Sequence, residues 1–358
     1  MGISKNNTGE KEIMEDTTRN IQYISFLRVI AVLSVITLHT NGCFWEYSTN
    51  QYWISANIIE SFFYFGVPIF FMISGITLID YQDRYSICVY LKKRTVKVVL
   101  PFIIWSVIGI VYRVQTGTIA VSSITIKNAA NWILKTGIIS HYWFFPSIIC
   151  IYCCIPLFAA VPKAKRRTIF GYLIMVGFVF NILIPFIKTI LSFDIHTPIS
   201  VSVVGNSLFY VVVGVFLHEN ELTKKGKMTI YIVGIGGLLF HIIGTYSLST
   251  NAGEIVDTYK GYNNLPCVLH SIAVFVFLKE IGRKIMKTKA GKWVQMMGDY
   301  AFPAFLMQWF ILDIGRRTIN FDETNLIYRL GAPLIVYGVI MVITFVLRKI
   351  PIIRKIVP

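Results

Sequence analysis

Apolar residues along the chain occur in long blocks, separated by short polar segments that carry most of the charges. The clearest blocks cover residues 24–38, 96–111, 170–187 and 330–347. A helix needs roughly 20 apolar residues to cross the hydrocarbon core of a bilayer. Backbone polar groups in lipid must be hydrogen-bonded within their own segment, so each block is predicted to be a helix.

This pattern predicts an all-α, polytopic transmembrane helix bundle with about ten spans. The predicted spans are 23–45, 54–79, 96–113, 141–161, 168–187, 200–218, 228–247, 263–281, 293–313 and 326–347. An amphipathic segment at 128–138 is expected to lie in the membrane interface. The chain then divides into a polar tail at 1–20, a transmembrane domain at 21–350 and a basic tail at 351–358.

Composition favours a membrane protein over a soluble one. Hydrophobic residues make up 55% of the chain and charged residues 15%, whereas a soluble domain usually carries about 25% charged residues. If the blocks were core helices of a soluble protein, little would remain for a polar surface. No short apolar core with a small-residue cleavage site follows residues 1–20, so the first block is expected to be a retained span.

The net charge of +16 would suggest nucleic-acid binding in a soluble protein. Here the basic residues lie between the apolar blocks, where the positive-inside rule explains them. With the N-terminus in the cytoplasm, most of the 34 Lys and Arg residues fall on the cytoplasmic side. We therefore expect both termini in the cytoplasm, membrane lipid as the surroundings, and no nucleic-acid partner.

Three of the six cysteines, Cys150, Cys153 and Cys154, lie close together in one apolar block. No second ligand pair follows at zinc-site spacing, so no metal site is predicted. The three are expected to be buried small apolar residues, and no disulfide framework is predicted.

Arg28 and His39 are ionisable residues within the first predicted span, where such residues are costly and indicate a functional site. Their spacing places both on one helix face, about 16 Å apart along the axis. Glu46 continues the same stripe and could orient His39. Taken singly, Arg28 could snorkel to the interface and His39 could make a structural interhelical hydrogen bond. Together they indicate a polar cavity.

Two further segments carry candidate site residues. The stretch 65–75 contains Gly and Pro, so it is either a tightly packed kinked span or a helix bent around a cavity that Ser74 lines. Arg94 and Lys97 share a helical face beside Lys93. They are either membrane-interface anchors or a phosphate-binding patch for a nucleotide-bearing donor.

The order and spacing of several short motifs resemble those of the acyltransferase family 3 of bacterial membrane proteins, over nearly the whole chain. The motifs are Leu27-Arg28 followed by Ala31 and His39, Val67 to Gly75, Lys93 to Lys97 leading to Leu100-Pro101, His141 to Phe144 with Pro156, and Tyr210 to Gly214.

The resemblance implies a ten-span protein of the bacterial plasma membrane that moves an acyl group, commonly acetyl from acetyl-CoA, to a sugar hydroxyl. The acceptor would be a surface glycan or its lipid-linked precursor. It makes Arg28 and His39 the essential pair and Arg94 and Lys97, with Lys93, the donor-binding residues. His141 and Trp143, which open the fourth predicted span, are assigned with Ser74 and Glu46 to the substrate cavity.

The sequence departs from the family pattern near the ninth predicted span. Gln308 stands where the family usually has His, and Pro303 replaces a Gly. Gln cannot take up a proton as imidazole can, so no acid–base role is expected at this position.

Two functions are compatible with these residues. In an O-acyltransferase, His39 would act as general base on the acceptor hydroxyl or accept the acetyl group itself. In a transporter, the same cavity would move a small polar solute or a glycan precursor, because a fold by itself does not fix a function. A scaffold without activity would gain nothing from Arg28 and His39.

Overall fold

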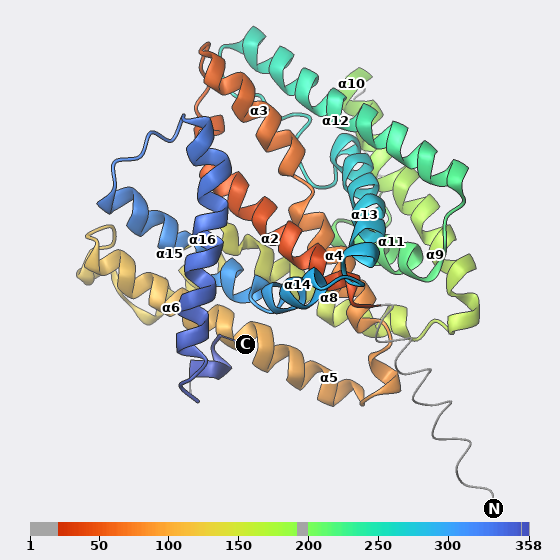
Figure 1. Cartoon of the computed structure of the whole chain (residues 1–358), viewed down its shortest axis with the longest axis horizontal. Coiled ribbons are helices and arrows are strands. Elements are labelled where there is room, and N and C mark those ends of the chain that lie inside the picture. The colour runs from red at the N-terminus through yellow and green to blue at the C-terminus, as the bar shows by residue number, and fades with distance from the viewer. Residues whose placement is uncertain (1–20, 192–199, 352, 358) are drawn as a thin grey trace, which may run out of the picture.

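The computed structural model describes residues 21–191, 200–351 and 353–357. The predicted tail 1–20 lies outside the described residues. Figure 1 shows the helices in chain order. They are α2 (Tyr23–Thr40), α3 (Gln51–Phe63), α4 (Gly66–Leu78), α5 (Ile87–Arg94), α6 (Leu100–Gln115), α7 (Ile126–Leu134), α8 (Phe144–Ala159), α9 (Lys163–Gly177), α10 (Ile184–Leu191), α11 (Ser207–Glu219), α12 (Lys224–Ala252), α13 (Leu265–Ile285), α14 (Ala290–Gly298), α15 (Ala301–Thr318) and α16 (Leu326–Leu347).

Short segments of tighter or wider helix join several of these elements. Two are π-helical, namely η3 (Thr95–Val99) and η6 (Phe178–Leu183). The others are 3-10 turns: η1 (Gly42–Trp45), η2 (Tyr81–Asp83), η4 (Val121–Ser123), η5 (Ser140–Trp143), η7 (Ser202–Val204) and η8 (Ile353–Lys355). No β-strand occurs among the described residues, and the predicted all-α class is confirmed.

Eight helical segments of the described chain are long and apolar enough to cross a membrane. Two of the ten predicted spans, 200–218 and 293–313, are not among these eight segments. The first holds only α11, whose 13 residues extend about 20 Å, short of the roughly 30 Å of the hydrocarbon core. The second is divided into α14 and α15, and α15 carries Asp313, Arg316 and Arg317 near its end.

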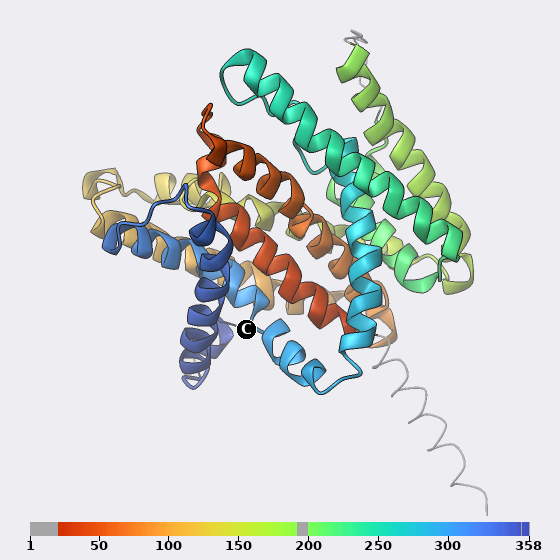
Figure 2. The ribbon, with the colours of Figure 1, turned by 45° about the horizontal axis from the view of Figure 1, so that its top comes forward.

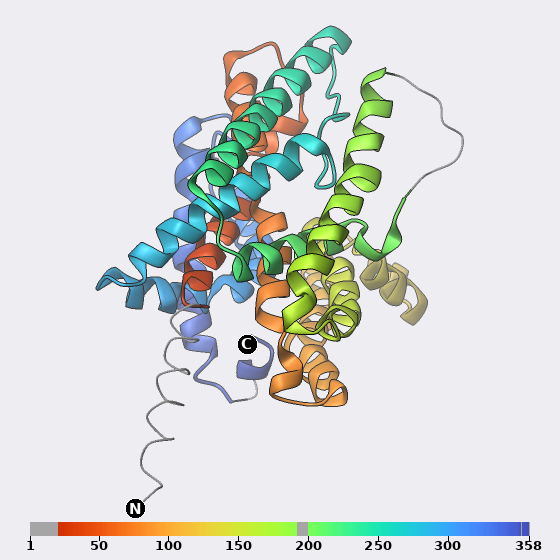
Figure 3. The ribbon, with the colours of Figure 1, turned by 90° about the vertical axis from the view of Figure 1, so that its right-hand side faces the viewer.

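Helix α2 lies in the interior of the bundle. It contacts α3, α4, α13, α14, α15 and α16, and Figure 2 shows it running through the middle of the molecule. Helices α9, α10 and α12 lie at the periphery (Figure 3). Ile232, Ile235 and Ile243 of α12 are exposed, as expected for a face that contacts lipid. The helix with Arg28 and His39 is therefore enclosed by protein.

Glycines allow α4 to pack closely on its neighbours. A Cβ atom at Gly75 would lie 2.6 Å from the carbonyl oxygen of Val211 on α11, and one at Gly214 would lie 2.6 Å from Cα of Met72 on α4. At Gly66, a Cβ would lie 3.0 Å from the carbonyl oxygen of Ala31 on α2. Small residues at such crossings let backbones touch, which drives helix association in lipid.

Ion pairs gather at the end of the bundle where α2 begins. Arg166 at the start of α9 contacts Asp80 after α4 and Glu219 at the end of α11, both at 2.7 Å. Tyr23 Oη lies 2.9 Å from Nδ1 of His218. At the end of α16, Arg348 contacts Asp299, and the neighbouring Gly298 packs on Ser25 of α2. The start of α2 and the end of α16 therefore lie at one end of the bundle.

Candidate active site

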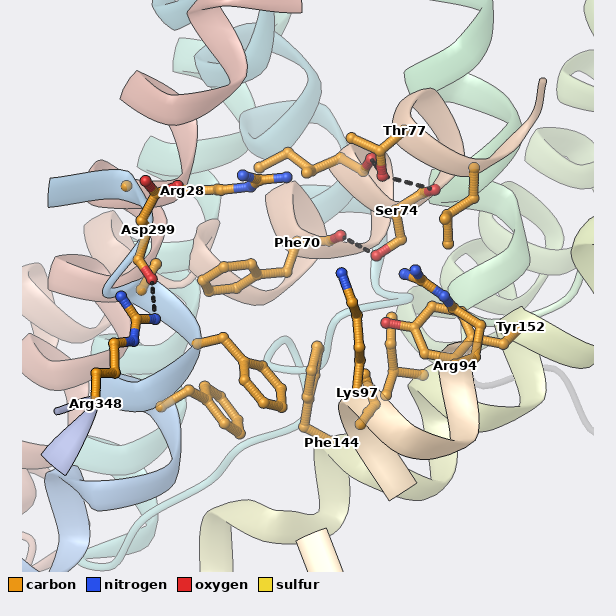
Figure 4. Close-up of a pocket in the computed structure, with 18 residues that line it drawn as sticks. Arg28, Phe70, Ser74, Thr77, Arg94, Lys97, Phe144, Tyr152, Asp299 and Arg348 are labelled. Atoms are coloured by element: carbon orange, nitrogen blue, oxygen red, sulfur yellow. Dashed lines mark hydrogen bonds between the residues drawn. The ribbon is translucent and has the colours of Figure 1, made fainter. Parts of the chain in front are cut away.

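A cavity of about 480 Å³ opens between α2, α4, α5, η3, α8, α14, α15 and α16. We call it the first cavity. It contains four of the predicted site residues, namely Arg28, Ser74, Arg94 and Lys97. Figure 4 shows Arg94 and Lys97 pointing toward Ser74, while Arg28 reaches in from the opposite side. The tertiary structure thus brings residues from the first, second and third predicted spans to one place.

Local structure explains how these side chains face the cavity. The π-helical η3 follows Arg94 directly and contains Lys97, and π-segments often occur at functional sites because the extra residue re-aims side chains. On α4, the Ser74 hydroxyl donates to the carbonyl oxygen of Phe70 at 2.8 Å. Its oxygen still has acceptor capacity for a ligand.

Positive charge dominates the first cavity. Its charged lining residues are Arg28, Arg94, Lys97 and Arg348, against the single carboxylate of Asp299. Arg348 donates to the backbone oxygens of Asp299 at 3.0 Å and of Val357 at 3.2 Å. The Asp299 carboxylate is therefore outnumbered by cations, which suits a ligand with several negative charges. Sequence reasoning missed Arg348 and Asp299, because only the fold brings them beside Arg28.

A pair of histidines lies beyond an aromatic layer. The rings of His39 and His141 are 5.0 Å apart, measured between centroids. His141 Nε2 lies 3.1 Å from the carbonyl oxygen of Phe305. A carbonyl oxygen only accepts hydrogen bonds, so Nε2 donates and Nδ1 of His141 carries the lone pair. The predicted residues His39 and His141 are thus neighbours, although they come from different spans.

Phe70, Phe144 and Phe305 pack on one another beside the first cavity, and we call them the aromatic wall. The centroids of these three rings are 4.8 to 6.3 Å apart. The Phe305 ring also packs on His141, with centroids 5.4 Å apart. All three residues line the first cavity, whereas His39 and His141 do not. Phe305 belongs to both regions. Its ring lines the first cavity, and its carbonyl oxygen accepts a hydrogen bond from His141 Nε2.

A buried polar chain fixes the end of α2 beyond His39. Arg329 of α16 donates to Asn41 Oδ1 at 3.2 Å, and Asn41 donates to Glu60 Oε2 at 3.3 Å. Glu60 Oε1 lies 3.6 Å from Lys260 Nζ. Burial lowers the pKa of Lys260, and the Glu60 carboxylate opposes that shift. This polar chain could not be predicted, because Arg329 and Lys260 lie far from Asn41 and Glu60 in the sequence.

Three predicted site residues lie elsewhere. Helix α2 ends at Thr40 and a 3-10 turn follows, so Glu46 is exposed and is not on the His39 stripe, contrary to the sequence pattern. Lys93 Nζ lies 3.9 Å from the centre of the Tyr85 ring and does not line the first cavity. Trp143 faces a second cavity on the other side of α4.

Three further positions that the sequence singled out are Cys150, Cys153 and Gln308. Cys150 and Cys153 are exposed and not buried, and Cys150 lines the second cavity. Within the described residues, no group of His, Cys, Asp or Glu is placed to hold a metal ion. Gln308 is fully buried, and neither its Oε1 nor its Nε2 has a hydrogen-bond partner among the described residues.

A protein-family model described as an acyltransferase domain matches residues 21–348. The chain therefore belongs to this family, the acyltransferase family 3 that its motifs resemble. Searches of curated proteins and of solved structures returned no match. Together with its apolar helices, the family makes this protein a membrane acyltransferase.

Proposed function

We propose that the protein is an O-acyltransferase of the bacterial plasma membrane, which transfers an acetyl group from acetyl-CoA to a hydroxyl of a cell-surface polysaccharide or its lipid-linked precursor. One observation carries the proposal: Arg28, Arg94 and Lys97 share one cavity with an excess of positive charge. The phosphates of CoA are the ligand that such a cluster suits, since charge-assisted hydrogen bonds to phosphate are strong.

The volume of the first cavity, about 480 Å³, suits part of the donor. In the proposed complex the phosphates contact Arg94, Lys97 and Arg28 at the end of the bundle where α2 begins. The narrow pantetheine arm then extends past the aromatic wall toward His39. Displacement of the Phe70 or Phe305 ring opens this path.

In the simplest reaction, His39 acts as general base with His141 beside it. His39 takes the proton of the acceptor hydroxyl while the hydroxyl oxygen attacks the thioester carbonyl carbon. The carbon–sulfur bond then breaks, and the CoA sulfur leaves as a thiolate that regains a proton. The products are the acetyl ester and the CoA thiol. General-base catalysis of this kind contributes about 10²- to 10⁴-fold to the rate.

The proposal is tested with membranes that contain the wild-type protein or a variant, supplied with acetyl-CoA and envelope glycan from a deletion strain. His39→Ala should lower acetyl transfer by about 10²-fold or more. The double variant Arg94→Ala and Lys97→Ala should raise the KM for acetyl-CoA at least about tenfold, because two charged contacts to phosphate are lost.

Lys93→Ala is the matched control, because Lys93 is an adjacent cation that lies on Tyr85 and outside the first cavity. It should leave the KM for acetyl-CoA within about twofold of the wild-type value. Unchanged glycan acetylation in His39→Ala at equal protein level would contradict the proposed mechanism. Solute uptake by proteoliposomes in the absence of acetyl-CoA would favour a transporter instead.

A further inference from the structure

A second cavity of about 710 Å³ lies beside the first, on the other side of the contact between α4 and α8. It is bounded by α8, the π-helical η6, the segment that contains η7, the start of α11 and the loop after α12. Phe71 lines it, whereas the preceding residue, Phe70, lines the first cavity. Phe71 also stacks on Phe144 of the aromatic wall at 5.4 Å. Two adjacent residues of α4 thus form part of the partition between the cavities.

The two cavities differ in charge. Among the described residues, none that lines the second cavity is charged, whereas the first cavity holds four cations and one carboxylate. The polar residues that line the second cavity carry amides and hydroxyls, and they include Asn181, Ser202, Asn206 and Asn263. Charge complementarity directs an anionic donor to the first cavity and an uncharged ligand rich in hydroxyl groups to the second.

A stack of aromatic rings forms one wall of the second cavity. Trp143 packs on Tyr262 with ring centroids 5.3 Å apart, and Tyr262 packs on Tyr64 at 4.5 Å. The Tyr210 hydroxyl donates to the Tyr262 backbone oxygen, which fixes the loop to α11. Trp143 remains 38% exposed, so its face is open to a ligand. A flat apolar ring face beside amides matches a sugar ring, which has apolar C–H faces and a rim of hydroxyls.

The polar rim next to this stack is held in an unusual conformation. Asn206 has a φ angle of 50°, a region that costs about 1–3 kcal/mol for a residue with a side chain. Its Oδ1 accepts from Asn263 Nδ2 at 3.0 Å. Asn206 Nδ2 and Asn263 Oδ1 make no other hydrogen bond among the described residues, and both residues line the second cavity.

One short turn of the chain connects the second cavity to the histidine pair. Trp143 belongs to η5, the same 3-10 turn as His141, whose ring lies 5.0 Å from that of His39. Tyr142 lies between His141 and Trp143 in the sequence. Its hydroxyl donates to the backbone oxygen of Leu306 at 2.8 Å and so holds the turn against α15. Trp143, which lines the second cavity, is therefore two residues from His141 in the same turn.

We infer that the second cavity is the acceptor site and binds an uncharged saccharide, with a sugar ring on the exposed part of Trp143 and hydroxyls on Asn206 and Asn263. The inference rests on the acyl transfer proposed above and identifies where, and in which chemical class, the acceptor binds. Donor and acceptor then approach the histidine pair from opposite sides of the aromatic wall.

The test uses membranes with each variant, radiolabelled acetyl-CoA as donor and envelopes of a deletion strain as acceptor. Ser202→Trp places a large side chain in the second cavity. Val203→Trp is the matched control, because Val203 is 59% exposed and does not line that cavity in the described chain. Ser202→Trp should reduce label transfer at least about tenfold, whereas Val203→Trp should change it by less than about twofold.

Binding of acetyl-CoA is measured separately and should be unchanged in Ser202→Trp, because the donor cavity lies across the partition. If the purified variant does not elute as a folded protein, Trp143→Ala and Trp143→Phe replace it. The alanine variant should raise the KM for the acceptor about tenfold, and the phenylalanine variant should restore most of the affinity.

The outcomes separate the two proposals. A wild-type protein that transfers no label from acetyl-CoA would overturn the proposed function and the acceptor site with it. Wild-type transfer that Ser202→Trp and Trp143→Ala leave unchanged would overturn the acceptor site alone. Mass spectrometry of the labelled glycan should place the acetyl group on a neutral sugar residue, and labelling of an acidic sugar would overturn the assignment to an uncharged acceptor.

Discussion

Arg28 is an arginine within a membrane-spanning helix, and its surroundings explain how the bundle accommodates it. A charge in a bundle is tolerated where it faces a polar cavity or a partner. Arg28 meets this condition because α14 and α16 bring Asp299 and Arg348 to the same cavity. The guanidinium thus faces a polar cavity that also contains a carboxylate, which offsets the cost of its charge.

His141 is the residue at which the role of a single nitrogen can be tested. Its Nε2 donates to the Phe305 carbonyl. A glutamine side chain is long enough to place its amide N–H at the Nε2 position. The shorter asparagine side chain reaches only the Nδ1 position. We therefore expect His141→Gln to retain activity within about tenfold of wild type. His141→Asn loses the hydrogen bond to Phe305, although the Phe305 carbonyl keeps its partner within α15, and it should lose more activity than His141→Gln.

Acetyl transfer by the two His141 variants at equal folded protein is the measurement. Equal, complete loss in both would show that the imidazole takes part in the chemistry itself, which would contradict a purely positioning role for His141.

At the level of elements, the crossing of α4 and α11 depends on glycine. A Cβ atom at Gly214 would lie 2.6 Å from Met72 Cα and 2.7 Å from its carbonyl oxygen, and the backbone cannot yield as a side chain can. Gly214→Ala should therefore lower stability by about 1–3 kcal/mol. It should also lower activity, because α4 carries Ser74 and both partition phenylalanines.

Gly236→Ala on α12 is the control, because nothing lies within 4 Å of the added Cβ. Alanine is the better helix former by about 1 kcal/mol, so this variant should be as stable as wild type or more stable. Thermal unfolding in detergent, followed by loss of the monodisperse peak, compares the two variants. A Gly214→Ala protein as stable as Gly236→Ala would show that the helices can separate without cost.

The two π-helical segments show how elements shape the cavities. Lys97 and Val98 of η3 line the first cavity, and Phe180 and Asn181 of η6 line the second. The apolar pattern predicted spans through both segments, because a π-turn leaves the span apolar. The π-turns themselves could not be predicted, since the extra residue is stabilised by contacts with other helices.

For the molecule as a whole, the arrangement of the ends allows a test of topology. The start of α2 and the end of α16 lie at one end of the bundle, together with the basic residues Arg166 and Arg283. The positive-inside rule predicts that this end faces the cytoplasm. A green fluorescent protein fused after Pro358 should therefore be fluorescent, and alkaline phosphatase fused there should be inactive.

Fusions after Thr324, in the loop before α16, should show the opposite behaviour and serve as the control. Active phosphatase at Pro358 would reverse the predicted orientation, and the donor would then have to reach the first cavity from the other side of the membrane.

Part of the site was predictable from sequence and part was not. Arg28, Ser74, Arg94 and Lys97 were predicted and lie in one cavity, because local motifs and helix periodicity placed them on inward faces. Glu46 and Lys93 were predicted and lie outside it. The prediction for Glu46 assumed an unbroken helix. In the structure α2 ends at Thr40, and Thr40 and Asn41 form hydrogen bonds with Arg329 of α16.

The sequence by itself determined that the chain is a helical membrane protein and located the eight long apolar helices, because lipid requires every backbone polar group to be satisfied within its own helix. It also determined that Arg28 and His39 share a helix face. Only the tertiary structure decided which residues meet them: Arg348 and Asp299 at one end, and His141 at the other. Such contacts join segments distant in sequence, and they depend on how glycines, aromatic rings and buried ion pairs let the helices pack.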